Sequence, residues 1–254
     1  MRKKRRIFRI RYWLMSVISI IILIFTWKGM KRLYHSGMES DYLKVKQIEV
    51  IGNRRFTKEY LLNQAGLEVG MNIVQINKEK IMERLNSPWI ETCSIKRYFP
   101  YVVKMCIKER RGSAIYQSCE ESYLIDGNGY LIDTIDLEKI EVRARNALPR
   151  IEYDGDIKPK IGQVCPPARS GVKILSDLKK EFPELLSNLK NIKLFNDEYA
   201  VLYVKGYCKK IYVNFQDKMK KLKLLRKIVR NIKADHEKIE YIDLRFKNRI
   251  IVGG

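Results

Sequence analysis

The chain has 254 residues and a net charge of +22, with 51 lysines and arginines against 29 acidic residues. That length allows one large or two modest domains, and a basic balance usually accompanies an anionic partner. Neither of the two histidines, His35 and His236, lies in a metal-ligand spacing, and no serine or cysteine has the neighbours that a catalytic nucleophile needs. The sequence therefore indicates a binding protein without cofactor or metal, and not an enzyme.

The N-terminus joins a basic tail to an apolar segment. Residues 1–11 carry seven cations, an uncharged stretch runs from Tyr12 to Trp27, and three more cations follow by Arg32. Such a run satisfies its backbone in hydrocarbon only as a helix, so residues 12–33 are predicted to be a transmembrane anchor. The uncharged stretch has 16 residues, fewer than the usual ~20. The cations before it place the tail in the cytoplasm and the remainder outside.

The alternative for this segment is a cleaved secretory signal, which shares the basic start and the short apolar core. No small-x-small cleavage site follows the core. We therefore expect a single-pass protein of the cell membrane, with a short polar linker at 34–42 and an exported portion beyond it. Outside the membrane, the candidate anionic partners are lipid headgroups or wall polymers rather than nucleic acid, and a solvated lysine-rich surface is the equal alternative. Five cysteines, an odd number without a C-x-x-C pair, favour mostly free, buried thiols.

Residues 43–112 show the pattern β-α-α-β-β. A strand over 43–51 ends in Gly52-Asn53, and a helix over 58–65 lies between a predicted cap, Thr57, and a glycine suited to its end, Gly66. Asn77 is predicted to cap a second helix that stops before Pro88 and carries Ile81, Met82 and Leu85 on one stripe. Strands over 90–98 and 102–109 follow, and the second places Val103, Met105 and Ile107 on one face.

Residues 113–254 predict a mixed α/β domain on a mostly antiparallel sheet. Residues 123–132 form a hairpin signal, which we prefer to a calcium loop at Asp126-x-Asn128 because further oxygen ligands are missing. Ser170 is the predicted cap of a helix that carries Val172, Leu175, Leu178 and Phe182 and is ended by Pro183. Strands are predicted over 199–204, 209–215, 239–246 and 249–252, with a long helix over about 217–234.

That long helix has two interpretations. An apolar stripe at helical spacing (Met219, Leu222, Leu225, Val229 and Ile232) is surrounded by lysines and arginines. The helix could lie on anionic lipid or accept an acidic partner. We prefer a helix that packs its stripe on a sheet, because a layered α/β domain needs that face for its core.

Several motifs carry a resemblance to known proteins. The first half resembles a POTRA domain in the motifs Val45-x-x-Ile48-x-Val50-x-Gly52-Asn53, Gly70-x-Asn72-Ile73, Pro88-Trp89-Ile90 and Pro100-x-x-Val103-x-Met105-x-Ile107. The C-terminal run Tyr241-Ile242-Asp243-Leu244-Arg245-Phe246 is similar to the last strand pair of the FtsQ/DivIB family of bacterial cell-division proteins. The departure at Gly112-Ser113, where that family often has a proline-containing segment, concerns the hinge between domains.

The resemblance implies an α+β protein with a transmembrane helix, a POTRA domain at 43–112 and an FtsQ/DivIB-type C-terminal domain at 113–254. It also implies a non-enzymatic scaffold of the divisome. Such a scaffold binds an FtsB/DivIC-like bitopic protein, itself paired with an FtsL-like protein, and helps to coordinate wall synthesis at the septum. The POTRA domain is expected to offer a second docking surface.

A C-terminal strand at a sheet edge exposes unpaired backbone groups, which another chain can use for strand addition. From the resemblance we expect Phe246 to be an apolar anchor, Arg245 to bond an acidic partner residue, and Asn248 and Gly253 to allow close backbone approach. The complete set of expected partner-binding residues is Tyr241, Arg245, Phe246, Asn248, Ile250, Val252 and Gly253. For Tyr241 and Leu244, an inward-facing core position is the alternative.

A competing function is an exported surface protein that binds anionic wall polymer or lipid through the basic helix. The two functions differ in their response to salt. Binding driven by charge falls steeply as salt rises, whereas strand addition with an apolar anchor loses much less.

Overall fold

The computed structural model describes residues 13, 18–32, 41–118, 121–137, 148–195, 198–205, 208–214, 218–231, 239–247 and 249–254. It divides the chain into two units, the first formed by Met1–Asn86 with Thr92–Lys108 and the second by Ser87–Glu91 with Glu109–Gly254. Residues 18–32 are helical. Among the described residues, no helix has both the length and the apolar character that a membrane span requires. The predicted anchor at 12–33 lies partly outside the described residues.

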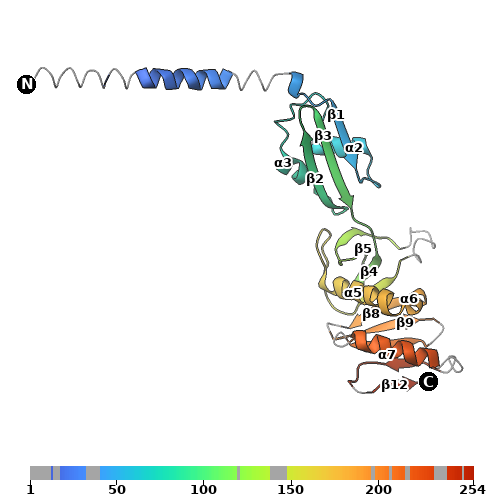
Figure 1. Cartoon of the computed structure of the whole chain (residues 1–254). Coiled ribbons are helices and arrows are strands. Elements are labelled where there is room, and N and C mark those ends of the chain that lie inside the picture. Colours follow the sequence, from blue (N-terminus) through green and yellow to red (C-terminus); the bar gives the residue numbers. More distant parts are fainter. Residues whose placement is uncertain are drawn as a thin grey trace, which may run out of the picture. The chain divides into compact units, whose positions relative to one another are not determined.

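The first unit is a three-stranded sheet with two helices (Figure 1). The strand order is β1-β3-β2, and β1 runs parallel to β3 with Gln47 opposite Val102. Its elements are the 3₁₀ turn Asp41–Leu43, β1 (Gln47–Ile51), α2 (Lys58–Ala65), α3 (Lys78–Arg84), β2 (Ile90–Tyr98) and β3 (Val102–Glu109). The predicted order β-α-α-β-β is confirmed.

Local signals explain why this half was predictable. The Thr57 side chain accepts a hydrogen bond from the Tyr60 N–H, and Gly66 ends α2 in the left-handed conformation at φ 64°. Asn77 accepts a hydrogen bond from the Lys80 N–H at the start of α3. The caps predicted for both helices are therefore confirmed.

Two details of the first unit were predicted wrongly. Met82 is 52% exposed although it was assigned to the stripe of Ile81, because one residue along a helix rotates the side chain by about 100°. The first strand begins at Gln47 and not at Leu43. The backbone before it bonds a loop instead, since the Ile73 N–H donates to the Leu43 carbonyl at 2.9 Å and the Val45 N–H donates to the Met71 carbonyl at 2.8 Å.

The second unit is built on a nine-stranded sheet with the order β12-β11-β10-β9-β8-β7-β4-β5-β6. Parallel pairing joins β4 to β7, β7 to β8 and β10 to β11, and the other neighbours are antiparallel. A mostly antiparallel mixed sheet is therefore confirmed. The strands are β4 (Ala114–Ser118), β5 (Glu121–Ile125), β6 (Leu131–Thr134), β7 (Arg150–Tyr153), β8 (Leu189–Phe195), β9 (Tyr199–Val204), β10 (Lys210–Asn214), β11 (Tyr241–Asp243) and β12 (Ile251–Gly253).

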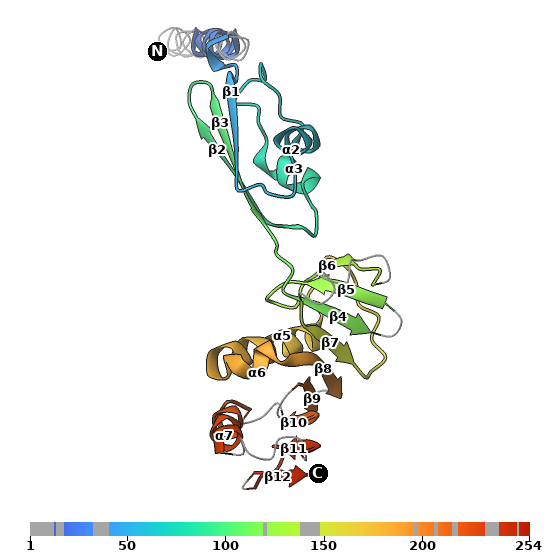
Figure 2. The same ribbon diagram turned by 90° about the vertical axis from the view of Figure 1, so that its right-hand side faces the viewer.

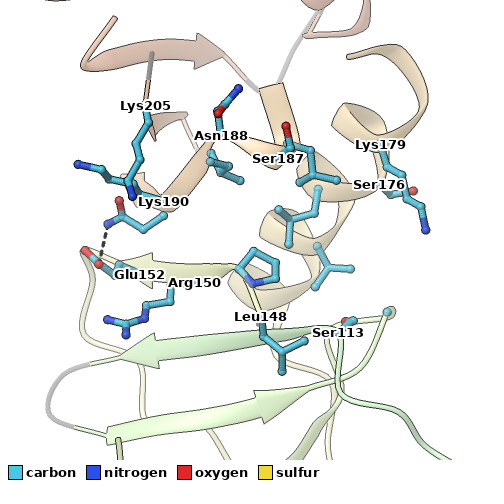
Figure 3. A pocket seen from close by; sticks show the side chains of 17 residues that line it. Ser113, Leu148, Arg150, Glu152, Ser176, Lys179, Ser187, Asn188, Lys190 and Lys205 are labelled. Carbon is cyan, nitrogen blue, oxygen red and sulfur yellow. Dashed lines mark hydrogen bonds between the residues drawn. The ribbon is translucent and has the colours of Figure 1, made fainter. Parts of the chain in front are cut away.

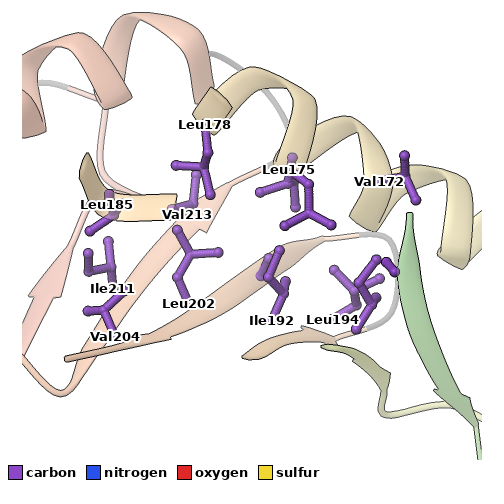
Figure 4. Close-up of a cluster of buried hydrophobic side chains, with 14 of the residues drawn as sticks. Val172, Leu175, Leu178, Leu185, Ile192, Leu194, Leu202, Val204, Ile211 and Val213 are labelled. Carbon is purple, nitrogen blue, oxygen red and sulfur yellow. The ribbon is translucent and has the colours of Figure 1, made fainter. Parts of the chain in front are cut away.

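Helices α5 (Pro166–Glu181), α6 (Pro183–Ser187) and α7 (Lys218–Asn231) lie on one face of this sheet (Figure 2). Figure 4 shows the core between them, where leucines and valines of α5 and α6 meet the inward residues of β8, β9 and β10. Leu222 and Leu225 of α7 are buried in the same core, which confirms the packing interpretation at those two positions. The side chains of Met219, Val229 and Ile232 lie outside the described residues.

Some elements of the second unit differ from the prediction. Helix α5 begins at Pro166 after Cys165, so Ser170 lies within the helix and does not cap it. The two prolines in the first turn are compatible with this start, because the first N–H groups of a helix have no partner inside it and proline lacks only that group. Pro183 does end α5, but it also begins α6. Strands β4, β7 and β8 were not predicted, and β11 and β12 are shorter than expected.

Four cysteines fall within the described residues, and all four are free. Cys165 and Cys208 are buried, whereas Cys93 and Cys106 are half-buried. Burial raises the pKa of the Cys208 thiol to about 11 and also raises the pKa of Cys93. The thiols of Cys93 and Cys208 therefore stay protonated at neutral pH, as expected of structural cysteines. Cys119 lies outside the described residues.

Candidate partner-binding edge

Strand β12 forms one end of the nine-stranded sheet, and no described strand pairs with its outer side. It runs antiparallel to β11, with Ile242 opposite Val252 and Tyr241 opposite Gly253. The Glu240 N–H donates to the Gly253 carbonyl at 2.8 Å, so the backbone of Gly253 faces β11. Since backbone groups alternate in direction along a strand, Val252 turns its N–H and C=O toward the open side. The Val252 side chain is 45% exposed.

The opposite end of the sheet is covered by the chain's own backbone. Beside β6, the Leu131 N–H donates to the Gln163 carbonyl and the Gly162 N–H donates to the Leu131 carbonyl, both at 2.9 Å. The Cys165 N–H donates to the Gly129 carbonyl at 3.0 Å, and Tyr130 forms an isolated bridge with Val164. An uncovered strand edge exposes a sheet to non-specific pairing. The two ends of this sheet therefore differ, and β12 is the open one among the described residues.

Gly253 allows an aromatic ring to lie across the edge. A Cβ atom at this position would lie 2.2 Å from Cε1 of Tyr241, which is too close for any side chain unless the ring moves. The Tyr241 ring also packs edge-on against Tyr212 at a centroid distance of 6.1 Å. Tyr241 is 38% exposed, whereas Leu244 is fully buried. Of the two core alternatives, Leu244 takes the core position and Tyr241 lies at the surface.

Arg245 is held by an acidic residue of its own chain. Its Nη2 donates to Oδ2 of Asp243 at 2.7 Å, and its Nε lies 3.1 Å from both carboxylate oxygens. The guanidinium also lies over the rings of Tyr199 and Tyr212, 4.8 and 4.9 Å from their centroids. A carboxylate and two rings thus fix the orientation of the side chain. The structure shows an internal acidic partner for Arg245, and the expected bond to an acidic partner residue stays a prediction.

Asp243 and Arg245 each stabilise the charged form of the other. Burial alone raises the pKa of Asp243, but the hydrogen bonds and the positive charge of Arg245 outweigh burial and hold that pKa below its usual value. The hydrogen bond to Asp243 in turn raises the pKa of Arg245. Both groups are therefore charged at neutral pH, although Asp243 is only 5% exposed. A buried carboxylate with such a partner positions the arginine that follows β11.

The remaining expected residues lie around the same edge. Phe246 is 37% exposed, and the guanidinium of Arg249 lies 4.9 Å from its ring centroid. Ile250 is half-buried and packs against the hydrophobic core. Asn248 lies outside the described residues. Tyr241 and Gly253 are thus cross-strand neighbours, with Val252 next to Gly253 in β12, and Arg245 and Tyr241 both contact Tyr212. Ile250 supports the strand from the core side.

Sequence reasoning missed three residues of this edge, namely Asp243, Tyr199 and Tyr212. Strand alternation gave a signal for Asp243, because residues two apart share a face and could have suggested its pairing with Arg245. Tyr199 and Tyr212 belong to β9 and β10, and only the sheet order brings them beneath the guanidinium.

A separate hollow of about 1220 Å³ lies between helix α5 and the strands β7 and β8 (Figure 3). Its lining is basic, with Arg150, Lys179, Lys190 and Lys205 around Glu152. The side-chain amide of Asn191 donates to Glu152 at 2.7 Å. The described lining offers no nucleophile with an adjacent base, and the described residues hold no group of histidines, cysteines and carboxylates that could bind a metal.

A small three-stranded sheet with two helices, followed by a nine-stranded mixed sheet covered by helices, defines a two-unit α+β protein. The model of the POTRA domain, FtsQ-type, matches residues 43–110, and that of the C-terminal domain of cell division protein FtsQ/DivIB matches residues 114–245. The chain belongs to the FtsQ/DivIB family of cell division proteins, which are not enzymes.

Individual relatives agree with this family over most of the chain. Cell division protein FtsQ of Syntrophotalea carbinolica is 26% identical over 84% of this chain and 74% of its own length. Cell division protein FtsQ of Geobacter sp. strain M21 is 24% identical over 87% and 80%, respectively. Cell division protein DivIB of Clostridium botulinum strain Loch Maree is 23% identical over 97% and 91%. The resemblance inferred from the sequence is therefore confirmed.

Proposed function

We propose that this chain is a bitopic scaffold of the divisome that binds the FtsB/DivIC–FtsL pair at the β12 edge and helps to coordinate septal wall synthesis. The observation that carries this proposal is the open side of β12, where Val252 presents its backbone groups while the opposite end of the sheet is covered. Strand addition needs such an edge, and side chains beside it supply specificity. Membership of a cell-division family directs the edge toward a division partner.

Around the edge, the side chains favour a partner that combines an extended backbone with apolar groups. Tyr241, Phe246 and Val252 are each between 37% and 45% exposed. Aromatic anchors at the centre of an interface contribute most of its binding energy. The pairing of Arg245 with Asp243 makes Arg245 a positioning residue in this proposal, with its exposed part available for contact.

The anchor belongs to the same proposal. Apolar side chains of the helical residues 18–27 are exposed, from 49% for Ile24 to 75% for Phe25. An exposed apolar helix behind a basic tail is typical of a segment in hydrocarbon with its N-terminus in the cytoplasm. The protein would then lie in the cell membrane, concentrated at the septum, with both sheets and their helices outside. The first unit would serve as a second docking surface.

A proline at position 252 tests the edge directly. Val252→Pro removes a backbone N–H that points away from β11, so the pairing of β11 with β12 stays intact. A strand that adds to the open side of β12 loses one hydrogen bond and clashes with the pyrrolidine ring. For the full chain in lipid nanodiscs, we expect about tenfold weaker binding of the DivIC/FtsB-like protein from the same cell. Val252→Thr, which keeps the N–H and the branched shape, is the matched control and should bind normally.

Salt separates this proposal from the competing one. Binding at the edge should survive a rise from low to physiological salt, because apolar contacts and backbone hydrogen bonds are little screened. Binding that is lost with salt and unaffected by Val252→Pro would refute the edge and favour the basic face of α7. Binding that resists salt and is unaffected by Val252→Pro would also refute binding at the β12 edge and would point to a contact on the first unit.

A further inference from the structure

The turn between β2 and β3 carries exposed aromatic side chains that the proposed function does not use. Tyr98, Phe99 and Tyr101 are 50%, 60% and 40% exposed, and together we call them the aromatic tip. Isolated apolar residues at a surface are normal, but neighbouring aromatic residues at one turn form a patch. Tyrosine and phenylalanine in such a patch suit an environment that is partly apolar and partly wet.

The aromatic tip lies where the chain begins the first unit. The Lys46 N–H donates to the Tyr101 carbonyl at 2.9 Å, and the Lys46 ammonium lies 5.2 Å from the centre of the Tyr101 ring. Gln47, the first residue of β1, is opposite Val102, the first residue of β3. Figures 1 and 2 both show the β2–β3 turn at the same end of this unit as the start of β1. The tip is therefore fixed to the segment that follows the predicted anchor.

A second exposed apolar group lies at the same end. The loop with Val69, Met71 and Val74, which are 66%, 36% and 39% exposed, bonds the segment before β1 through its backbone. The Arg97 guanidinium, next to the tip, donates to the Val74 carbonyl at 3.2 Å and joins the loop to the turn. Two segments, the turn and the loop, thus place exposed apolar side chains at one end of the unit.

The charged residues next to the aromatic tip itself are the exposed cations Lys46 and Lys96. Two acidic residues lie farther from the rings, namely Asp41, which is paired with Lys44 at 2.5 Å, and the exposed Glu68 beside Val69. Lysines beside exposed aromatic rings are the composition that binds a membrane interface, since rings enter the headgroup region and ammonium groups meet anionic lipids. Charge and apolar character therefore both match a lipid surface.

The short segment 33–40, which we call the tether, keeps this surface within reach of the bilayer. Eight residues, 33–40, separate the helical segment from Asp41. The nine steps of extended chain from residue 32 to Asp41 span at most about 30 Å, so Asp41 stays close to the outer end of the anchor. A partner protein must be recruited to a surface, whereas the membrane is already held beside this one.

We propose that the aromatic tip, with the apolar loop beside it, inserts into the outer interface of the membrane and docks the first unit on lipid. This inference rests on the anchor of the proposed function, because the tether supplies the proximity. The ligand is the bilayer interface, with Phe99 and Tyr98 between headgroups and Lys46 and Lys96 at anionic lipids.

Fluorescence quenching in lipid nanodiscs tests the docking. A coumarin amino acid replaces Phe99 in the full chain, and nanodiscs of phosphatidylethanolamine and phosphatidylglycerol carry a nitroxide lipid that quenches on contact. The matched control places the same label at Tyr60, which is 47% exposed in the first turn of α2, after the other end of β1. We expect severalfold stronger quenching at position 99 than at position 60, and a loss of quenching at a labelled position 98 when Phe99→Asp is introduced.

The natural tryptophans separate the two proposals in the same sample. Trp13 and Trp27 lie within the predicted anchor and should be quenched if it lies in the bilayer, and Trp89→Phe removes the emission of the third tryptophan. Quenched Trp13 and Trp27 with equal, weak quenching at positions 99 and 60 would overturn the lipid contact and leave the anchor standing. Unquenched Trp27 would refute the anchor. It would also refute the docking of the aromatic tip, because that proposal depends on the anchor.

Discussion

Arg245→Ala should loosen the edge of the sheet by leaving a buried carboxylate without its cation. Asp243 retains 7% of its side-chain exposure, so little water can replace the guanidinium. Removing one partner of a fully buried ion pair costs about 3–5 kcal/mol. Because 37% of the Arg245 side chain is exposed, solvent already screens part of the interaction, and we expect about 2 kcal/mol. That loss corresponds to about 30-fold more frequent local opening.

Hydrogen exchange read by mass spectrometry on the full chain in nanodiscs measures that opening strand by strand. Amides of β11 and β12 should exchange faster in Arg245→Ala, while those of β1 to β3 keep their rates. The matched control is Lys209→Ala, which removes a pair with the same 2.7 Å separation, between Lys209 and Glu240, at a site where both side chains are largely exposed. Equal exchange in the two variants would refute the argument that burial makes the Asp243 pair important.

The same pair predicts how the edge responds to pH. The folded-state pKa of Asp243 is lowered, so its contribution is fully present above the unfolded carboxyl pKa of about 3.9 and is lost as pH falls through the lower, folded value. After correction for intrinsic exchange, β11 should keep its protection from neutral pH to mildly acidic pH and lose it below about pH 4. Asp243→Asn should remove this pH dependence, and a persistent transition in that variant would assign it to another group.

Two further substitutions test other contacts. Gly253→Ala should displace the Tyr241 ring and cost about 0.5–1.5 kcal/mol of edge stability, with a larger loss of partner binding, as measured by exchange and titration. Arg110→Ala should expose the β5–β6 hairpin to exchange at a cost of about 3–5 kcal/mol, because Asp126 is 6% exposed and bonds Arg110 at 2.7 Å. Arg110→Lys should rescue only part, since the guanidinium lies 3.6 Å from the centre of the Tyr130 ring, and full rescue would show that charge alone suffices.

The predictable parts of the fold were those specified by neighbours in sequence. Helix α2 has its cap, stripe and terminal glycine within ten residues, and β2 and β3 meet across a short turn. Strand β7 gave no such signal, because it has four residues, only Ile151 fully buried, and parallel partners far away in sequence on both sides. Parallel pairing leaves no hairpin turn to read, so β7 required the structure. Strand β8 is parallel to β7 but antiparallel to β9 across a short connection, so a local signal for it existed and was missed.

The candidate site divides in the same way. A C-terminal strand at the sheet edge followed from alternation and chain order, and the family resemblance directed attention to Tyr241 and its neighbours. The orientation of Arg245 did not follow, since Tyr199 and Tyr212 come from other strands. A sequence pattern reports which residues share a strand face, but it does not report what the neighbouring strands place beneath them.

The small size of β12 limits what strand addition alone can contribute. The strand has three residues, and only Val252 turns its backbone groups outward within it, so the backbone offers about two hydrogen bonds of about 0.5–1.5 kcal/mol each. A micromolar complex requires about 8 kcal/mol. Most of the affinity must therefore come from side chains beside the strand, and Phe246 is the largest exposed apolar group directly after β11.

Phe246→Ala should accordingly weaken partner binding more than Val252→Pro. Truncation of an aromatic anchor typically costs about 2 kcal/mol or more, or about 30-fold in affinity, against about tenfold for the lost backbone contact. The exchange of β11 should change little, because Phe246 lies outside the strand and its ring contacts Arg249 at the surface. If Phe246→Ala binds normally while Val252→Pro does not, backbone pairing dominates and the contact must extend beyond the three residues of β12.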